Sequence, residues 1–488
     1  MALVALVSLG SCKRDFLDRQ PLGRYVDDDI PAGSYDSKIF AAYSTLRAGG
    51  FNNHLYLGIH SYRSDESQKG SSVSDGADQG LMFDEFQYVA TNGGIAEYWS
   101  AHYATIIAAN AIIADIDSLQ LTDPNTLINK AEAKFLRAYA FFDLVRTFGE
   151  VPKVDFKITD AAQVNIAKSP VPQLYALIDA DLAEAAATLP VNWDPTYTGR
   201  LTRGAALALQ ARTQMFRKNY AAALSAAKSV IGLNKYSLVA NYGSQFRKEG
   251  ENGSESIFEI QAFYTPTQNL GIIYSNVQGV RGAGSWDLGW GWNAPTKNLV
   301  DSFETGDPRR VATILYSGQV DPLYGENVPP VPTIAQPYWN KKVYTNPADR
   351  LALNNRFGPW MNHRIIRYAD VLLMAAEAAN ELGGAQNTTD ALMWLEMVRG
   401  RARTGTPAGT LPAVTTTNQG ALRDAIRHER LVEFGMEESR FWDLVRWEID
   451  VAVLTAAGKT YEIKHRLLPL PQGEIDKSGG TLIQNPNY

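Results

Sequence analysis

Apolar residues recur at intervals of three and four positions through most of the first half of the chain. This spacing is that of a helix with one buried face. In residues 95–119, for example, Trp99, Tyr103, Ile106 and Ile113 would share one side. The predicted helices span residues 34–48, 95–119, 127–148, 171–188, 202–217 and 220–233. Alanine-rich helix pairs joined by short turns are typical of tetratricopeptide-like repeats, although the usual repeat signature is degenerate here.

The same helical spacing returns near the C-terminus and predicts three further helices between residues 364 and 447. The first begins around Ile365 and ends at the pair Gly383 and Gly384, where a left-handed C-cap fits. Thr388 and Asn418 are candidate N-caps of the second and third helices. The small alanines at positions 375, 376, 378 and 379 allow close helix packing.

The third of these helices also carries alternating charges. Its charged residues are mostly three or four positions apart, which would let opposite charges meet along one side of the helix. We expect this group to be structural, together with the apolar block that follows it. The charged residues are Arg427, Glu429, Arg430, Glu433 and Glu437, and the apolar block comprises Phe441, Trp442, Leu444 and Trp447.

Residues 236–363 lack the helical pattern. SIFEIQAF alternates like a strand, VRGAGSWDLGWGWN is rich in glycine and tryptophan, and VPPVPTIAQP is rich in proline. Loops and short strands are therefore predicted here, with helix again at PTKNLVDSFE. Because the helices on either side need each other to close a core, we expect residues 34–488 to form a single domain.

Several of these segments carry a family resemblance. RYADVLLMAAEA, VRGRA, ERLVEFGMEESRFWDLVRW and the terminal LLPLPQGEIDKSGGTLIQNPNY closely resemble the SusD-like (RagB/SusD) family. Upstream, AEAKFLRAYAFFDLVRTFGEVPKV and GWNAPTKNLVDSFETGDPRR also match, so the resemblance covers nearly the whole chain in the family's order. It implies a mainly α fold with a ligand region in the insertion. It further implies a surface glycan-binding lipoprotein of Bacteroidetes that delivers oligosaccharide to a SusC-like TonB-dependent transporter.

Composition and the single cysteine refine this picture. The 488 residues carry a net charge of -6, and no basic stripe suggests nucleic-acid binding. Cys12 follows MALVALVSLGS, which resembles a bacterial lipobox. Residues 1–11 then form a signal peptide, although no Lys or Arg precedes the apolar run, which leaves a truncated or misassigned start open. Lipid on Cys12 and a tether over 12–33 would anchor the protein to the outer membrane, exposed at the surface.

Candidate ligand contacts lie in two loops. A pyranose presents a face of C–H groups ringed by hydroxyls, so it needs a flat aromatic surface with polar groups at its edge. Trp286, Trp290 and Trp292 stand among glycines, and Trp290 and Trp292 would share one side of an extended segment. Trp339 is a weaker candidate. In the early loop, at about residues 58–80, the candidate contacts are Tyr62, Arg63 and Asp65; the resemblance independently implies Arg63, Asp65, Trp286 and Trp290.

Enzyme signals are poor. No zinc motif or phosphate loop is present, and acidic pairs arise by chance among 52 acidic residues. We therefore predict a protein without catalytic residues, metal or cofactor. The main alternative is a helical-repeat protein that binds a peptide or protein, and a glycoside hydrolase ranks below it. The tryptophan-rich loop favours a glycan ligand over a peptide, because a peptide-binding groove does not require such a loop.

Overall fold

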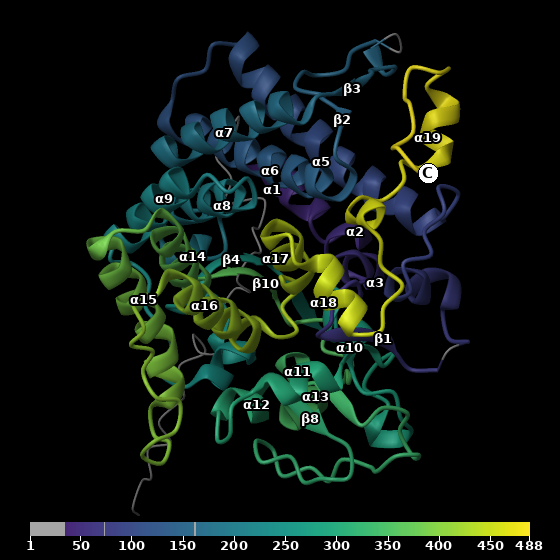
Figure 1. Ribbon diagram of the computed structural model, residues 1–488. Coiled ribbons are helices and arrows are strands. Elements are labelled where there is room, and N and C mark those ends of the chain that lie inside the picture. Colours follow the sequence, from purple (N-terminus) through teal and green to yellow (C-terminus); the bar gives the residue numbers. More distant parts are fainter. Residues whose placement is uncertain (1–34, 73, 161–162) are drawn as a thin grey trace, which may run out of the picture.

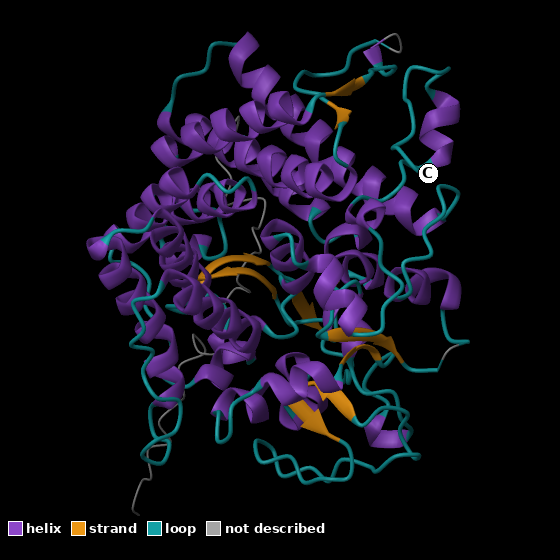
Figure 2. Ribbon diagram, in the orientation of Figure 1, coloured by secondary structure: helices purple, strands orange, loops and turns teal. Residues whose placement is uncertain are grey.

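The computed structural model describes residues 35–488 apart from 73, 161 and 162. Helices form most of the molecule, and the strands are short (Figure 2). The predicted mainly α class is confirmed. Cys12, with the predicted signal peptide and the whole predicted tether, lies outside the described residues.

Long helices form the scaffold, and each packs against the next: α5 on α6, α6 on α7, α7 on α8 and α8 on α9. Their order matches the helix pairs predicted from the sequence. The N-terminal and scaffold helices are α1 (Asp36–Thr45), α2 (Gly49–Asn52), α3 (His54–Leu57), α4 (Met82–Asp84), α5 (Gly93–Ser118), α6 (Pro124–Phe148), α7 (Val171–Thr188), α8 (Arg203–Phe216) and α9 (Tyr220–Gly232).

The next scaffold position is taken by a helix from much later in the chain. Helix α14 packs against α9 and α8, so residues 233–367 leave the scaffold and return to it (Figure 1). The five alanines of α14 are fully buried, as close packing requires. The later helices are α14 (Tyr368–Leu382), α15 (Ala385–Arg403), α16 (Gln419–Phe434), α17 (Arg440–Trp447), α18 (Asp450–Ala456) and α19 (Gln472–Lys477).

Side-chain caps fix where several scaffold helices begin. Asp123 accepts a hydrogen bond from the Thr126 N–H at 2.9 Å, with Pro124 in the first turn of α6. Asn92 caps α5 in the same way, and Asn418 caps α16 as predicted, accepting from the Ala421 N–H at 3.0 Å. Helix α6 ends at Gly149, whose φ of +77° favours glycine.

The segment between α9 and α14 contains short antiparallel ribbons and small helices. Its helices are α10 (Tyr274–Gln278), α11 (Lys297–Ser302), α12 (Pro308–Thr313) and α13 (Pro347–Ala352). Among the described residues, the strands pair as β1 (Ser67–Gly70) with β7 (Trp292–Pro295), β2 (Val151–Pro152) with β3 (Lys168–Ser169), β4 (Ser256–Ile260) with β10 (His363–Arg367), β5 (Phe263–Thr265) with β6 (Gln268–Leu270), and β8 (Ile314–Tyr316) with β9 (Tyr338–Asn340).

Three boundary predictions were wrong. Ile365 lies in β10, because residues 363–367 pair with β4 and only then does α14 begin. Thr388 lies inside α15, which starts at Ala385 after Gly384, so the turn sets the boundary instead of a threonine cap. The third predicted helix is two helices, since Met436 and Glu438 adopt φ of +69° and +58° and redirect the chain between α16 and α17.

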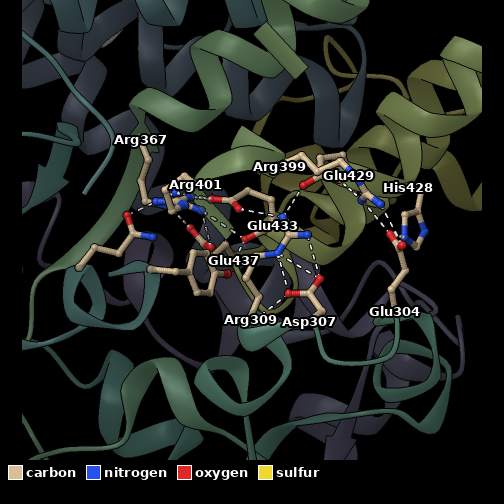
Figure 3. A network of polar contacts seen from close by, with 12 residues as sticks. Glu304, Asp307, Arg309, Arg367, Arg399, Arg401, His428, Glu429, Glu433 and Glu437 are labelled. Atoms are coloured by element: carbon tan, nitrogen blue, oxygen red, sulfur yellow. Dashed lines mark hydrogen bonds and ion pairs between the residues drawn. The ribbon is translucent and has the colours of Figure 1, made fainter. Parts of the chain in front are cut away.

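The charged residues Glu429, Arg430 and Glu433 of α16 are buried, and Glu429 and Glu433 pair with other elements (Figure 3). Glu433 contacts Arg309 of α12 and Arg367 of β10, each at 3.2 Å, and also Arg401 of α15. Glu429 binds Arg309 and Arg399. The group is therefore structural, as expected, and its ion pairs join α16 to the elements around it. We call Arg309, Arg367, Arg401, Glu429, Glu433 and Glu437 the charged interior.

The apolar block after the charged interior is core, as expected. Phe441 and Leu444 are fully buried, and Trp442 and Trp447 nearly so. Across the described part of the chain, no helix combines the length and apolar character needed to cross a bilayer.

Candidate ligand-binding surface

The first half of the early loop, residues 58–69, is folded into the interior. Tyr62 and Arg63 are fully buried. The Arg63 guanidinium donates to the backbone oxygens of His465 and Arg466 and lies 4.0 Å from the centre of the Phe441 ring. These contacts tie the loop to the C-terminal segment. The structure thus places Tyr62 and Arg63 as internal supports, without surface for a ligand, where the sequence suggested an open loop.

The two acids that follow are also packed inside. Asp65 is 9% exposed and accepts both hydrogen bonds of the Arg440 fork, at 2.8 and 3.0 Å. Glu66 accepts from the Met436 N–H at 3.1 Å, and burial raises the pKa of its carboxyl to about 8. Asp65 and Glu66 therefore tie the residues just before β1 to the start of α17 and to the turn that precedes it, and they offer no binding edge to a ligand.

That neighbouring loop, residues 281–291, is the aromatic loop. Hydrogen bonds across its base hold it: the Leu288 N–H donates to the Val280 oxygen, and the Gly291 N–H donates to the Gly279 oxygen, both at 2.9 Å. The Trp290 N–H donates to the Asn276 oxygen at 2.9 Å. Arg281 at its start pairs with Asp75. The loop is consequently fixed in shape before any ligand arrives.

Two of the four candidate tryptophans are core residues. Trp292 is 3% exposed, and its indole N–H donates to Asp75 at 2.9 Å. A Cβ on Gly76, whose φ is +63°, would lie 2.3 Å from this ring, so glycine is needed for the approach. Trp339 is 1% exposed and donates to the Ser317 hydroxyl at 3.0 Å. Neither ring offers a face to a ligand.

The other two, Trp286 and Trp290, are partly exposed. Trp286 lies parallel to Tyr344, with ring centres 6.2 Å apart and 6° between planes, and the adjacent Asp287 pairs with Arg356. Trp290 packs edge-on against Trp292, with ring centres 5.4 Å apart, and Gly291, at a φ of +75°, interrupts the extended conformation between them. The loop thus presents aromatic surface beside charged groups.

Sequence reasoning missed the residues that support these rings. Tyr344 and Arg356 are more than 55 positions beyond Trp286, and no local pattern links them. His54, whose ring centre is 5.7 Å from that of Trp290, has a buried Nδ1 without a hydrogen-bond partner, and burial lowers its pKa. Within residues 35–488, gaps excepted, no group of three or more His, Cys, Asp or Glu side chains is arranged to hold a metal ion.

Comparison with known proteins assigns the chain to a family. A family model described as the SusD family matches residues 240–488, which is more than half of the chain. The chain belongs to the SusD family. A second model, described as starch-binding and associating with the outer membrane, matches residues 15–215. The family resemblance predicted from sequence is therefore confirmed.

Individual relatives agree along the full length of this SusD-family chain. It is 26% identical over 516 residues to SusD-like protein P2 of Formosa agariphila, covering 100% of this chain and 98% of the relative. A laminarin-binding SusD-like protein superposes with a TM-score of 0.77 at 27% identity, over 93% of this chain and 98% of the other. Surface glycan-binding protein A of Bacteroides thetaiotaomicron, solved with laminarihexaose, gives 0.76 at 25% identity, over 93% and 98%.

Proposed function

We propose that this protein binds oligo- or polysaccharide through the aromatic loop, at the surface of the outer membrane. The observation that carries the proposal is the partial exposure of Trp286 and Trp290 on a loop whose backbone is already fixed. Family membership and the laminarin and laminarihexaose named for two similar structures support it.

The chemistry of the loop suits a sugar. An indole ring offers the flat apolar face that the C–H groups of a pyranose require, while Arg281, Asp287 and Arg356 can donate to or accept from hydroxyls at the ring edge. Because the loop is preorganised, little conformational entropy is lost on binding. Trp286 and Trp290 are therefore the proposed contacts. The other candidates are buried and are not proposed to touch the ligand: Tyr62, Arg63, Asp65, Trp292 and Trp339.

Affinity electrophoresis against a panel of polysaccharides, laminarin included, tests this function. We expect one or more to retard the wild-type protein, and Trp286→Ala and Trp290→Ala to weaken binding about tenfold or more, as truncation at aromatic hot spots does. Phe156→Ala is the matched control, since Phe156 is 38% exposed and lies between β2 and β3 in the sequence. In Figure 1 these two strands lie at the top of the view, and α10, which precedes the aromatic loop, lies in the lower half. Full affinity in both tryptophan variants would contradict the proposed site.

Binding is proposed to occur without turnover. Incubation of clean protein with any polysaccharide that retards it should release no new reducing ends. Sustained release of reducing ends would instead assign the protein to the hydrolases.

The protein is further proposed to deliver its ligand to a SusC-like TonB-dependent transporter, anchored by lipid on Cys12. Support comes from the family and from the lipobox-like residues before Cys12. Affinity capture from membranes of a native host should recover a large β-barrel transporter in near-equal amount. Cys12→Ala should leave the protein folded but free it from the membrane fraction, whereas unchanged fractionation would contradict the anchor.

A further inference from the structure

A separate pocket lies where the loop joining α7 to α8 meets strand β4. Its volume is about 370 Å³, and it shares no residue with the aromatic loop. Small-molecule sites generally occupy roughly 300–1,000 Å³, so the space is sufficient for a ligand. Its walls include Trp193, Tyr197, Lys235, Asn252, Ser254 and Gln261.

Trp193 supplies an aromatic wall that is held in place. Its indole N–H donates to the Leu201 oxygen at 2.8 Å, and the Arg200 guanidinium lies 4.1 Å from the ring centre. Arg200 is itself fixed by a two-pronged bond to Glu132, at 2.9 and 2.6 Å. The ring is partly exposed although it is fixed on one side, an arrangement that fits a stacking surface.

Amide groups form a polar edge across the pocket. Asn252 and Gln261 exchange two hydrogen bonds, at 2.9 and 3.0 Å, so their orientations are set. Gly199 brings the loop against Gln261: its φ is +96°, and a Cβ there would lie 2.7 Å from the Gln261 side chain. Aromatic surface and oriented amides face the same space, as saccharide recognition requires.

Charge in the pocket is unbalanced. Arg200 is neutralised by Glu132. Glu259 accepts a hydrogen bond from Asn362 and lies 3.9 Å from the Arg364 guanidinium, which balances its charge. Lys235 is half-buried and donates to the Val191 backbone oxygen at 2.6 Å, and among the described residues no carboxylate oxygen lies within 4.0 Å of its ammonium. Burial without a partner of opposite charge lowers the pKa of Lys235. An anion bound next to the ammonium would therefore stabilise its charged form.

We propose that this pocket is a second saccharide site, which takes a sugar unit bearing an anionic group, with Trp193 under the ring and Lys235 on the charge. A uronate carboxylate or a sulfate ester would supply that group. The site is distinct from the aromatic loop and does not depend on ligand binding there.

Titration calorimetry of the full protein tests the proposal with three probes: oligogalacturonate hexamer, kappa-carrageenan hexaose and neutral laminarihexaose. We expect one or both anionic probes to bind, which identifies carboxylate or sulfate as the charge. Trp193→Ala and Lys235→Gln should each weaken that binding about fivefold or more, and the wild-type affinity should fall as salt is added.

Two control variants keep the result decisive. Lys228→Gln removes the same charge from an exposed position on α9 and should bind like wild type. Trp193→Phe keeps an aromatic face and should retain more affinity than Trp193→Ala, which separates stacking from any loss of folding. Failure of both anionic probes to bind, or full affinity in either Trp193→Ala or Lys235→Gln, would overturn the second site. Those outcomes leave the Trp286 and Trp290 test of the first site untouched.

Discussion

The charged interior and the aromatic loop invert the usual distribution of residue types. Charged side chains are normally exposed and tryptophans largely buried. Here Arg309 and Glu433 are fully buried, whereas Trp286 and Trp290 keep part of their surface in solvent. The charges can be buried because each has several partners of opposite sign, as Figure 3 shows. No comparable structural need accounts for exposed indole surface, which is why the aromatic loop and not the charged interior is the candidate for binding.

The largest expected effect comes from breaking the charged interior. Burial alone would raise the pKa of Glu433, but Arg401, Arg367 and Arg309 hold it below its usual range, so the carboxylate is charged and paired. Glu433→Ala leaves three buried cations short of a partner and should cost about 3–5 kcal/mol of unfolding free energy. Chemical denaturation measures this.

Asp301→Ala is the matched control for that variant. Asp301 forms an exposed pair with Lys297 within α11, and such pairs contribute little. Its denaturation midpoint should stay close to that of wild type. An equally small change in the denaturation midpoint of Glu433→Ala would show that the charged interior does not hold residues 233–367 to the helical scaffold.

The next effect separates the two tryptophans that touch one another. Trp292→Ala removes a buried ring and its hydrogen bond to Asp75, and should cost about 3–5 kcal/mol of stability. Trp290→Ala, two positions away, should leave the melting temperature nearly unchanged because its ring is partly exposed. Thermal melts of both variants check this. Equal loss of stability in the two would mean that Trp290 is core as well.

The contrast also shows what the sequence could and could not predict. Helix spacing located α5 to α9 within a few residues, since that signal is local. The partners of Glu433 lie 32, 66 and 124 positions away, so charge spacing on α16 identified a structural group but assigned its partners to the wrong element. Tertiary contacts decided the pairing.

The same limit applies to the candidate site. Glycine and tryptophan content correctly indicated a loop around 281–291, yet four rings of the same type divide evenly between core and surface. Trp292 is buried because β7 pairs with β1, and Gly76 opens space beside its ring. Arg63 is buried because the C-terminal segment covers it. Both causes lie more than 200 residues away in sequence, beyond any local pattern.

A smaller effect concerns how the two exposed tryptophans of the aromatic loop share the binding of one ligand. If Trp286 and Trp290 contact different units of one saccharide, their losses should add in the double variant, to about a hundredfold when each single change costs about tenfold. Titration with the best-binding polysaccharide fragment measures the three affinities. A double variant no weaker than either single variant would show that the two rings act as one contact.

The last effect depends on pH and concerns a buried acid that lacks the partners of Glu433. Glu66 is 1% exposed, its neighbour Arg440 is engaged by Asp65, and burial raises its pKa to about 8. The folded protein therefore retains a proton that the unfolded chain releases near pH 4.5. The contribution of Glu66 to stability is fully present below that pH and is lost as pH rises towards 8, with a slope of at most about 1.4 kcal/mol per pH unit.

Glu66→Gln keeps the oxygen that accepts from Met436 but cannot ionise, so its stability relative to wild type should increase between pH 5 and pH 8. Urea denaturation of both proteins at several pH values measures the difference, and a constant difference would show that Glu66 is charged in the fold, paired after all like the acids of the charged interior.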